Sequence, residues 1–153
     1  PCGYHGSTKK ACLCSPHGME LYYKKLSGPI LDRIDMHVRV KEVDLKKMTQ
    51  QQSSGESSTV IRQRVLAAHH IQLQRYRTTP YTRNADINSK DVKKLFKISP
   101  SAQLLLAKGA ARHRLSARGY FKVIKVAQTI ADLDHQNIIA PHHLAEALQY
   151  RHY

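Results

Sequence analysis

A polar segment divides the sequence into two parts. Residues 49–58 read Thr-Gln-Gln-Gln-Ser-Ser-Gly-Glu-Ser-Ser and contain no apolar side chain. A segment of this composition has nothing to bury in a hydrophobic core, so it predicts a linker or an exposed loop. We therefore expect two structural parts, at residues 1–45 and 58–153, joined by a linker at 46–57.

The first part is predicted to be irregular at its start. Residues 1–18 are rich in Cys, His, Gly and Pro, a composition that disfavours a regular helix. A short helix is predicted at 19–26, before a turn at 27–29. Polar and apolar residues alternate over 37–43, which predicts a half-buried strand and the only strand that we expect in the chain.

The second part is predicted to be helical throughout. Ile61, Val65, Ala68 and Gln72 recur at the spacing of one helix face, and the following segments repeat this pattern. Short connections between such helices are typical of a compact bundle. Capping residues and apolar spacing together predict helices at 58–76, 88–96, 99–115, 116–131 and 141–148.

The charge of the chain indicates an anionic partner. It has 25 Lys and Arg against 11 Asp and Glu, a net charge of +14, and the excess is +3 over residues 1–58 but +11 over 59–153. Such a charge attracts nucleic acid, nucleotides or acidic proteins, although it also suits a solvated surface. Tyrosines that could stack on bases, with core or interface packing as the alternative, are Tyr4, Tyr22, Tyr23, Tyr76 and Tyr81.

The sequence shows no sign of a membrane partner. No apolar run approaches the length of about 18 residues that crosses a bilayer, and no charged-then-apolar leader opens the chain. We therefore expect a cytoplasmic protein. Because the sequence begins without Met, we also expect a processed chain or an excised fragment.

Cysteines and histidines gather near the start of the chain, as Cys2, His5, Cys12, Cys14 and His17. Thiolate and imidazole are preferred ligands of tetrahedral zinc, so the cluster predicts a zinc site. The three thiols would need His5, His17 or a cysteine upstream of residue 1 to complete the set. The alternative is reduced thiols with surface histidines. A disulfide scaffold is not expected, because the rest of the chain has no Cys.

Arg33 follows the turn at 27–29 and lies between Asp32 and Asp35. A guanidinium at this position could reach a phosphate that a neighbouring molecule presents, whereas a local ion pair on the surface is the alternative. The phosphate-binding pattern G-x-x-x-x-G-K-[ST] does not occur in the sequence. We therefore expect that the chain by itself does not hydrolyse a nucleoside triphosphate.

Two adjacent histidine pairs, His69-His70 and His142-His143, lie in predicted helices. Neighbouring side chains diverge on a helix, so each pair is a poor metal chelate. We predict that these histidines are surface residues.

Short segments spread along the chain carry a resemblance to a known family. They are Cys2-Gly-Tyr, Cys12-x-Cys14-Ser-Pro, Leu26-Ser-Gly-Pro-Ile-Leu-Asp-Arg-Ile-Asp-Met-His-Val, Leu115-Ser-Ala-Arg-Gly-Tyr, Thr129-Ile-Ala-Asp-Leu and Ala147-Leu-Gln-Tyr-Arg151. In this order they resemble the C-terminal third of the ComM-type magnesium-chelatase-like AAA+ ATPases. The resemblance implies a mainly α fold: a helical lid bundle at 58–153, preceded by the last α/β segment of an AAA+ P-loop core at 1–45, with one strand and an irregular Cys loop.

The resemblance also implies roles for particular residues. Arg33 matches the arginine finger, which would stabilise charge on the γ-phosphate bound by an adjacent subunit. Arg118 matches the sensor-2 arginine of the lid, with a solvated first-turn residue as the alternative. ATP and Mg²⁺ would bind upstream of residue 1. Because the family pattern Cys-Pro-Cys-Gly is reduced here to Pro1-Cys2-Gly3, a fourth thiolate would also lie upstream, and His5 would substitute for it beside Cys2, Cys12 and Cys14.

The function that the resemblance implies belongs to a larger assembly. It is the C-terminal part of a hexameric DNA helicase that hydrolyses ATP and drives branch migration in recombination and natural transformation. One alternative is the ATPase motor of a metal chelatase or of a protein-remodelling unit. A second alternative is a non-enzymatic, zinc-tied basic module that binds nucleic acid, in line with the +11 charge of residues 59–153.

Overall fold

The computed structural model describes residues 1–25, 28–40 and 55–151. The chain divides into two compact units. The N-terminal unit comprises residues 1–34 and 38–53, and the helical unit comprises residues 35–37 and 54–153. Within the described ranges, no helix has the length and apolar content needed to cross a membrane.

The N-terminal unit contains an irregular loop followed by two short helices, α1 (Pro16–Lys25) and α2 (Gly28–Leu31). The helix predicted at 19–26 is confirmed over residues 19–25 and begins three residues earlier, at Pro16, while residues 26–27 lie outside the described ranges. The turn predicted at 27–29 is wrong at Gly28 and Pro29, which begin α2. The Oγ of Ser15 accepts a hydrogen bond from the N–H of Gly18 at 3.1 Å, which is the geometry of an N-cap. Proline suits the position after the cap because its missing N–H has no partner there in any case.

The strand predicted at 37–43 is wrong for the part that the structure describes. Residues 37–40 form no strand, and residues 41–43 lie outside the described ranges. Val38 and Val40, on the apolar side of the alternating pattern, are 66% and 86% exposed. Alternation predicts a strand only where a neighbouring strand and a covering layer exist, and residues 37–40 have neither among the described residues.

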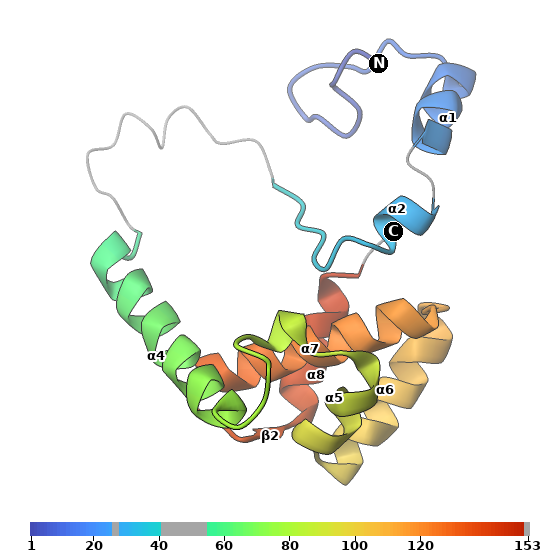
Figure 1. The fold of residues 1–153 in the computed structure, drawn as a ribbon. Coiled ribbons are helices and arrows are strands. Elements are labelled where there is room, and N and C mark those ends of the chain that lie inside the picture. Colours follow the sequence, from blue (N-terminus) through green and yellow to red (C-terminus); the bar gives the residue numbers. More distant parts are fainter. Residues whose placement is uncertain (26–27, 41–54, 152–153) are drawn as a thin grey trace. The chain divides into compact units, whose positions relative to one another are not determined.

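Helices make up most of the helical unit (Figure 1). The mainly helical character predicted for this part is confirmed, and Pro141 opens the last helix as expected. The residues whose side chains accept a backbone hydrogen bond at a helix start are Ser57, Asn88, Ser99 and Ser116. The helices are α4 (Ser58–Tyr76), η1 (Asn84–Asp86), α5 (Ser89–Leu95), α6 (Pro100–Arg112), α7 (Ala117–Leu133) and α8 (Pro141–Gln149).

Two short strands interrupt the helical pattern, contrary to the prediction that residues after the linker are helical throughout. Strand β1 (Lys97–Ile98) pairs in parallel with β2 (Ile138–Ile139), with Lys97 opposite Ile138 and Ile98 opposite Ile139. Two residues are too few to produce an alternating pattern, so the sequence carries no local signal for these strands. Ile139 is fully buried, which shows that the pair is anchored in the core.

Helix α7 lies at the centre of the helical unit (Figure 1), where it contacts α4, α5 and α8, while α6 packs on α8. Val123, Ala127 and Ala131 are buried on one face of α7, as their spacing predicts. Gly109 of α6 faces Leu148 of α8, and a Cβ at this position would lie 2.6 Å from Leu148 Cδ1. Glycine therefore allows α6 and α8 to approach closely.

The apolar face predicted for α4 is only partly covered. Ala68 and Gln72 are buried as expected, but Ile61 and Val65 are 45% and 55% exposed. The first turns of α4 project beyond α7 in Figure 1. The face is therefore longer than the surface of α7 that covers it.

A buried ion pair joins α4 to α7. The side chain of Asp132 is fully buried, and that of Arg75 is 14% exposed. Arg75 Nη1 donates to Asp132 Oδ2 at 2.8 Å, and Nη2 donates to the other carboxylate oxygen. Burial alone would lower the pKa of Arg75, but the adjacent Asp132 carboxylate raises it above its ordinary value. The guanidinium is thus held charged in a bidentate contact.

Neighbouring side chains complete the hydrogen bonding of Asp132. Asn84 Nδ2 donates to Asp132 Oδ2 at 2.8 Å, and Gln128 Nε2 donates to Oδ1 at 3.1 Å. The Oδ1 of Asn84 accepts a hydrogen bond from the Tyr76 hydroxyl at 2.5 Å. Burial raises the pKa of Tyr76 to about 12, so this hydroxyl keeps its proton at neutral pH. Each oxygen of the buried carboxylate therefore has two donors.

We expect Asp132→Asn to lower the free energy of unfolding by about 3–5 kcal/mol, because the substitution leaves the Arg75 guanidinium buried without a counter-charge. Urea unfolding of the purified chain measures this loss. Arg83→Met is the matched control: it removes the 66% exposed partner of Asp86, and such exposed pairs contribute only about 0–1 kcal/mol. Equal losses in the two variants would contradict the role assigned to Asp132.

Candidate functional site

The three cysteines come together in the loop of the N-terminal unit. The sulfur atoms of Cys2, Cys12 and Cys14 all lie within 4.8 Å of one another, and Cys2 Sγ is 3.6 Å from Cys12 Sγ. Gly3 and Gly6 have positive φ angles of 82° and 81° and let the loop turn back on itself. The cysteines are free thiols. Three converging sulfurs are a donor set that suits a tetrahedral zinc ion.

Backbone hydrogen bonds and neighbouring sulfur atoms shift the pKa values of Cys2 and Cys12. Hydrogen bonds from the backbone of Tyr4 and then of Leu13 lower the pKa of Cys2 to about 6. A hydrogen bond from the backbone of Cys14 lowers the pKa of Cys12, but the Cys2 sulfur and burial outweigh it, so the net pKa of Cys12 is raised. One thiolate thus makes the next harder to form, and a bound divalent cation would offset this repulsion.

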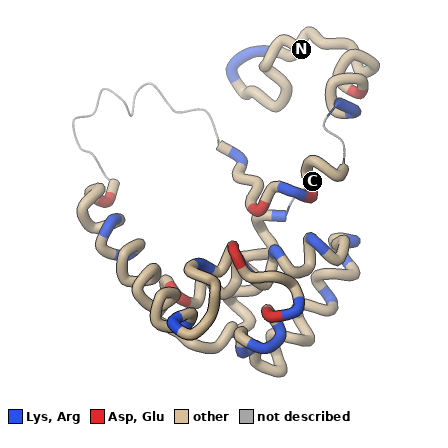
Figure 2. The backbone as a smooth tube through the Cα atoms, viewed as in Figure 1, with Lys and Arg blue, Asp and Glu red and all other residues tan. Residues whose placement is uncertain are grey.

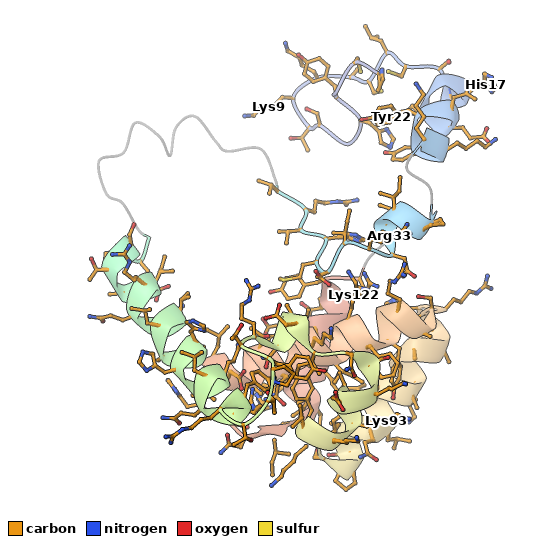
Figure 3. The ribbon with its side chains drawn as sticks, in the orientation of Figure 1. Lys9, His17, Tyr22, Arg33, Lys93 and Lys122 are labelled. Atoms are coloured by element: carbon orange, nitrogen blue, oxygen red, sulfur yellow. The ribbon has the colours of Figure 1, made fainter. Side chains whose placement is uncertain are left out.

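The two predicted histidine ligands differ in their placement. His5 lines the same pocket as the three cysteines, together with Met19 and Tyr22 of α1, although it is not among the grouped ligand atoms. Its ring makes an edge contact with Tyr23, with centroids 6.3 Å apart. His17 lies in the first turn of α1 and does not line that pocket (Figure 3). His5 is therefore the better placed of the two.

Arg33 lies in the turn that follows α2. The N–H of Arg33 donates to Ile30 O at 3.0 Å, and its guanidinium Nη1 donates to Pro29 O at 3.0 Å. The side chain is exposed (Figure 3). The Asp35 carboxylate, one of the two partners considered for a local ion pair, lies 2.7 Å from Lys122 Nζ. The turn thus holds an exposed guanidinium, as binding to an anion would require.

Arg118 occupies the second position of α7 and is exposed. The side chain of Ser116 caps this helix by accepting the N–H of Gly119 at 3.0 Å. A helix start carries a partial positive charge, so a phosphate near Arg118 would be favoured by both the guanidinium and the helix. Arg33 belongs to the N-terminal unit and Arg118 to the helical unit. Of the predicted site residues, the structure groups the three cysteines.

One histidine pair differs from the prediction. His69 and His70 are exposed as expected, but His143 is fully buried. The rings of His142 and His143 do not diverge, because their centroids are 3.9 Å apart. The signal in the sequence was Pro141, which sets the helix start and so places His143 at the third helical position, where a side chain can close a capping box.

The buried ring of His143 has a structural role. Its Nδ1 accepts the N–H of Ala140 at 3.0 Å, and its Nε2 lies 3.2 Å from Asp134 Oδ2. Because Nδ1 accepts, the proton of the neutral ring is on Nε2 and points to Asp134. His142 Nε2 also approaches this oxygen, at 3.7 Å. A metal would have to displace the proton on His143 Nε2 and thereby break the helix cap.

Exposed basic residues lie along α4 and gather in two further regions of the helical unit (Figure 2). One region is α5 with β1, and the other is the turn between α6 and α7. This basic surface comprises Lys90, Lys93, Lys94, Lys97, Lys108, Arg112, Arg114 and Arg118. Of the tyrosines considered for base stacking, Tyr76 is 2% exposed and belongs to the core, whereas Tyr22 and Tyr23 are 46% and 55% exposed.

Known proteins resemble the chain over both units. A family model described as magnesium chelatase, subunit ChlI C-terminal, matches residues 55–151, and one described as magnesium chelatase, subunit ChlI, matches residues 1–48. Competence protein ComM of Haemophilus influenzae is 34% identical over 99% of this chain and 28% of its own length. The uncharacterized protein YifB of Escherichia coli is 33% identical over 90% of this chain and 26% of its length. An uncharacterized protein of Mycobacterium tuberculosis is 32% identical over 99% of this chain and 30% of its length.

We expect the stability of the helical unit to decrease as the pH falls. Burial, reinforced by the charge of His142, lowers the pKa of His143 below its ordinary value of 6.5, and Asp134 and Glu146 only partly offset this. The unfolded chain therefore binds this proton more tightly than the folded chain, so the stabilisation is full above pH 6.5 and is lost as the pH falls further. Urea unfolding between about pH 8 and pH 5 measures the loss.

His143→Gln is the control for this prediction. Glutamine at the third helical position can also close a capping box, but it does not titrate. The variant is therefore expected to show a flatter dependence of unfolding free energy on pH than the original chain. Identical pH profiles for the two proteins would show that His143 is not the titrating group.

Proposed function

Because the chain belongs to the magnesium chelatase subunit ChlI family, we propose that it is the C-terminal part of an AAA+ ATPase. The match to relatives along 99% of this chain but only 28–30% of their length is the observation that carries the proposal. In this proposal, residues 1–45 are the last α/β segment of the nucleotide-binding core, 46–57 are a linker, and 58–153 are the helical lid. The whole protein would act in the cytoplasm.

The two exposed arginines would couple this chain to a nucleotide. ATP with Mg²⁺, held by parts of the whole protein outside these residues, supplies the phosphoryl group that is transferred to water. Arg33 would reach the γ-phosphate bound by an adjacent subunit of a hexameric ring, where its guanidinium stabilises developing charge. Arg118, at the start of α7, would act as the sensor-2 arginine of the lid. Both residues are exposed, as contacts with a separate molecule require.

DNA is the partner that we propose for the ring. One relative is named a competence protein, and the basic surface of the helical unit offers cationic side chains to a phosphate backbone. The proposed activity is therefore a ComM-like helicase that drives branch migration in recombination and natural transformation. If ATP hydrolysis instead depends on a protein or porphyrin partner and is unchanged by DNA, a metal chelatase motor or a protein-remodelling unit becomes the better assignment.

We expect Arg33→Ala in the complete protein to lower kcat for ATP hydrolysis by about 1,000-fold or more, while the Kd for ATP stays unchanged. The reason is that an arginine finger contacts the phosphate of a neighbouring subunit mainly in the transition state. Steady-state hydrolysis and equilibrium nucleotide binding measure the two quantities. Arg39→Ala, which removes another exposed arginine nearby, is the matched control and should hydrolyse ATP normally. Normal turnover by the Arg33 variant would overturn the assignment.

We also propose that the cysteine cluster binds zinc, with Cys2, Cys12, Cys14 and His5 as ligands. We expect the purified chain to contain one zinc ion, and Cys12→Ser to abolish binding because it removes one of the converging sulfurs. Elemental analysis after dialysis measures the zinc content. His5→Ala should weaken binding, whereas His17→Ala, outside the pocket, is the control and should not. Equal zinc content in the original chain and the Cys12 variant would contradict the proposal.

A further inference from the structure

A three-residue segment is fastened to the helical unit although its neighbours in the sequence are not part of that unit. Residues 35–37 belong to the helical unit, whereas residues 1–34 and 38–53 form the N-terminal unit. We call Asp35, Met36 and His37 the clasp segment. The Oδ1 of Asp35 lies 2.7 Å from Lys122 Nζ of α7, and the N–H of His37 donates to Tyr150 O at 2.8 Å. The segment is thus held at both of its ends.

Apolar packing supports the middle of the clasp segment. Met36 lines a pocket together with side chains from α7 and with Tyr150, directly after α8. The α7 residues of this pocket include Val126, Ile130 and Leu133. The apolar contact of Met36 thus lies between the polar contacts of Asp35 and His37. All three residues of the clasp segment bind to the same part of the helical unit.

The ion pair at the clasp segment is unequally exposed. The side chain of Lys122 is only 16% exposed, whereas that of Asp35 is 65% exposed. An ammonium group that is mostly removed from water benefits from a nearby carboxylate, so Lys122 favours the seated position of Asp35. Pairs with one exposed partner add little to global stability, at most a few-fold in an equilibrium constant. The contact is therefore suited to holding a segment in place.

Both partners of the ion pair lie close in the sequence to a proposed functional arginine. Only Ile34 separates Asp35 from Arg33. Lys122 is four residues after Arg118, one turn farther along the same side of α7. The ion pair therefore connects a residue that closely follows the proposed arginine finger in the sequence with the helix whose second residue is the proposed sensor-2 arginine.

We propose that Asp35 and Lys122 are positioning residues, whose ion pair ties the chain after Arg33 to α7 so that movement of the helical lid is transmitted to the arginine finger. This positioning role rests on the proposed function. The tie, by which we mean attachment of the clasp segment to α7 through the Asp35–Lys122 ion pair, does not. Neither residue contacts the nucleotide in this proposal. Their effect on catalysis would come from where they hold Arg33.

The tie is tested on the 153-residue chain by amide hydrogen exchange. The His37 amide, which bonds to Tyr150 O, reports on whether the clasp segment is seated. Asp35→Asn and Lys122→Gln should each speed its exchange by about fivefold, and the double variant should exchange no faster than either single variant. Arg64→Gln removes an exposed ion pair on α4 and is the control that should leave His37 unchanged. Unchanged His37 exchange in both single variants would overturn the tie.

The positioning role is tested by ATP hydrolysis in the complete protein. Asp35→Asn and Lys122→Gln should lower kcat by about fivefold with KM for ATP unchanged, while Asp35→Glu and Lys122→Arg, which keep the charges, should restore it. If Arg33→Ala abolishes turnover but Asp35→Asn leaves kcat unchanged, the positioning role is wrong and the proposed function stands. If Arg33→Ala hydrolyses ATP normally, the proposed function fails and the positioning role fails with it, whereas the tie is still judged by His37 exchange.

Discussion

The buried carboxylate of Asp132 is the constraint on which the helical unit depends. A charge without access to water is tolerated only when it is paired and fully hydrogen-bonded, and Arg75, Asn84 and Gln128 together meet this condition. Because these donors come from α4, η1 and α7, satisfying one carboxylate fixes three elements relative to one another. The position of α7 carries further consequences, since Arg118 lies in its first turn and Lys122 pairs with Asp35 of the clasp segment.

Local signals in the sequence predicted the helices well, and contacts between distant residues account for what was missed. Ser57, Asn88, Ser99 and Ser116 cap helices because a cap depends only on the next three residues. The parallel pairing of β1 with β2 joins residues 41 positions apart, such as Lys97 and Ile138, and has no local signal. The alternation at 37–43 was misleading for the opposite reason: the pattern is local, whereas a strand needs a distant partner.

In the candidate site, too, local spacing was readable from the sequence whereas contacts between distant residues were not. Spacing alone indicated that Cys2, Cys12 and Cys14 could share a ligand, and the structure groups their sulfurs. The roles proposed for Arg33 and Arg118 came from resemblance to a family, because an exposed arginine carries no periodic or spacing signal of its own. The contact between Asp35 and Lys122 could not be read from the sequence, since the two residues are 87 positions apart and either charge alone is typical of a solvated surface.

The uncovered start of α4 affects how the chain behaves in solution. Ile61 and Val65 present apolar surface to water, and such surface favours adhesion between copies of a protein. The net charge of +14 opposes adhesion, because like-charged molecules repel one another over about one Debye length. Salt shortens that length while leaving the apolar surface unchanged. Whether copies of this chain associate therefore depends on apolar attraction at the exposed face of α4 and on electrostatic repulsion from the net charge. Ionic strength determines which of these two forces is stronger.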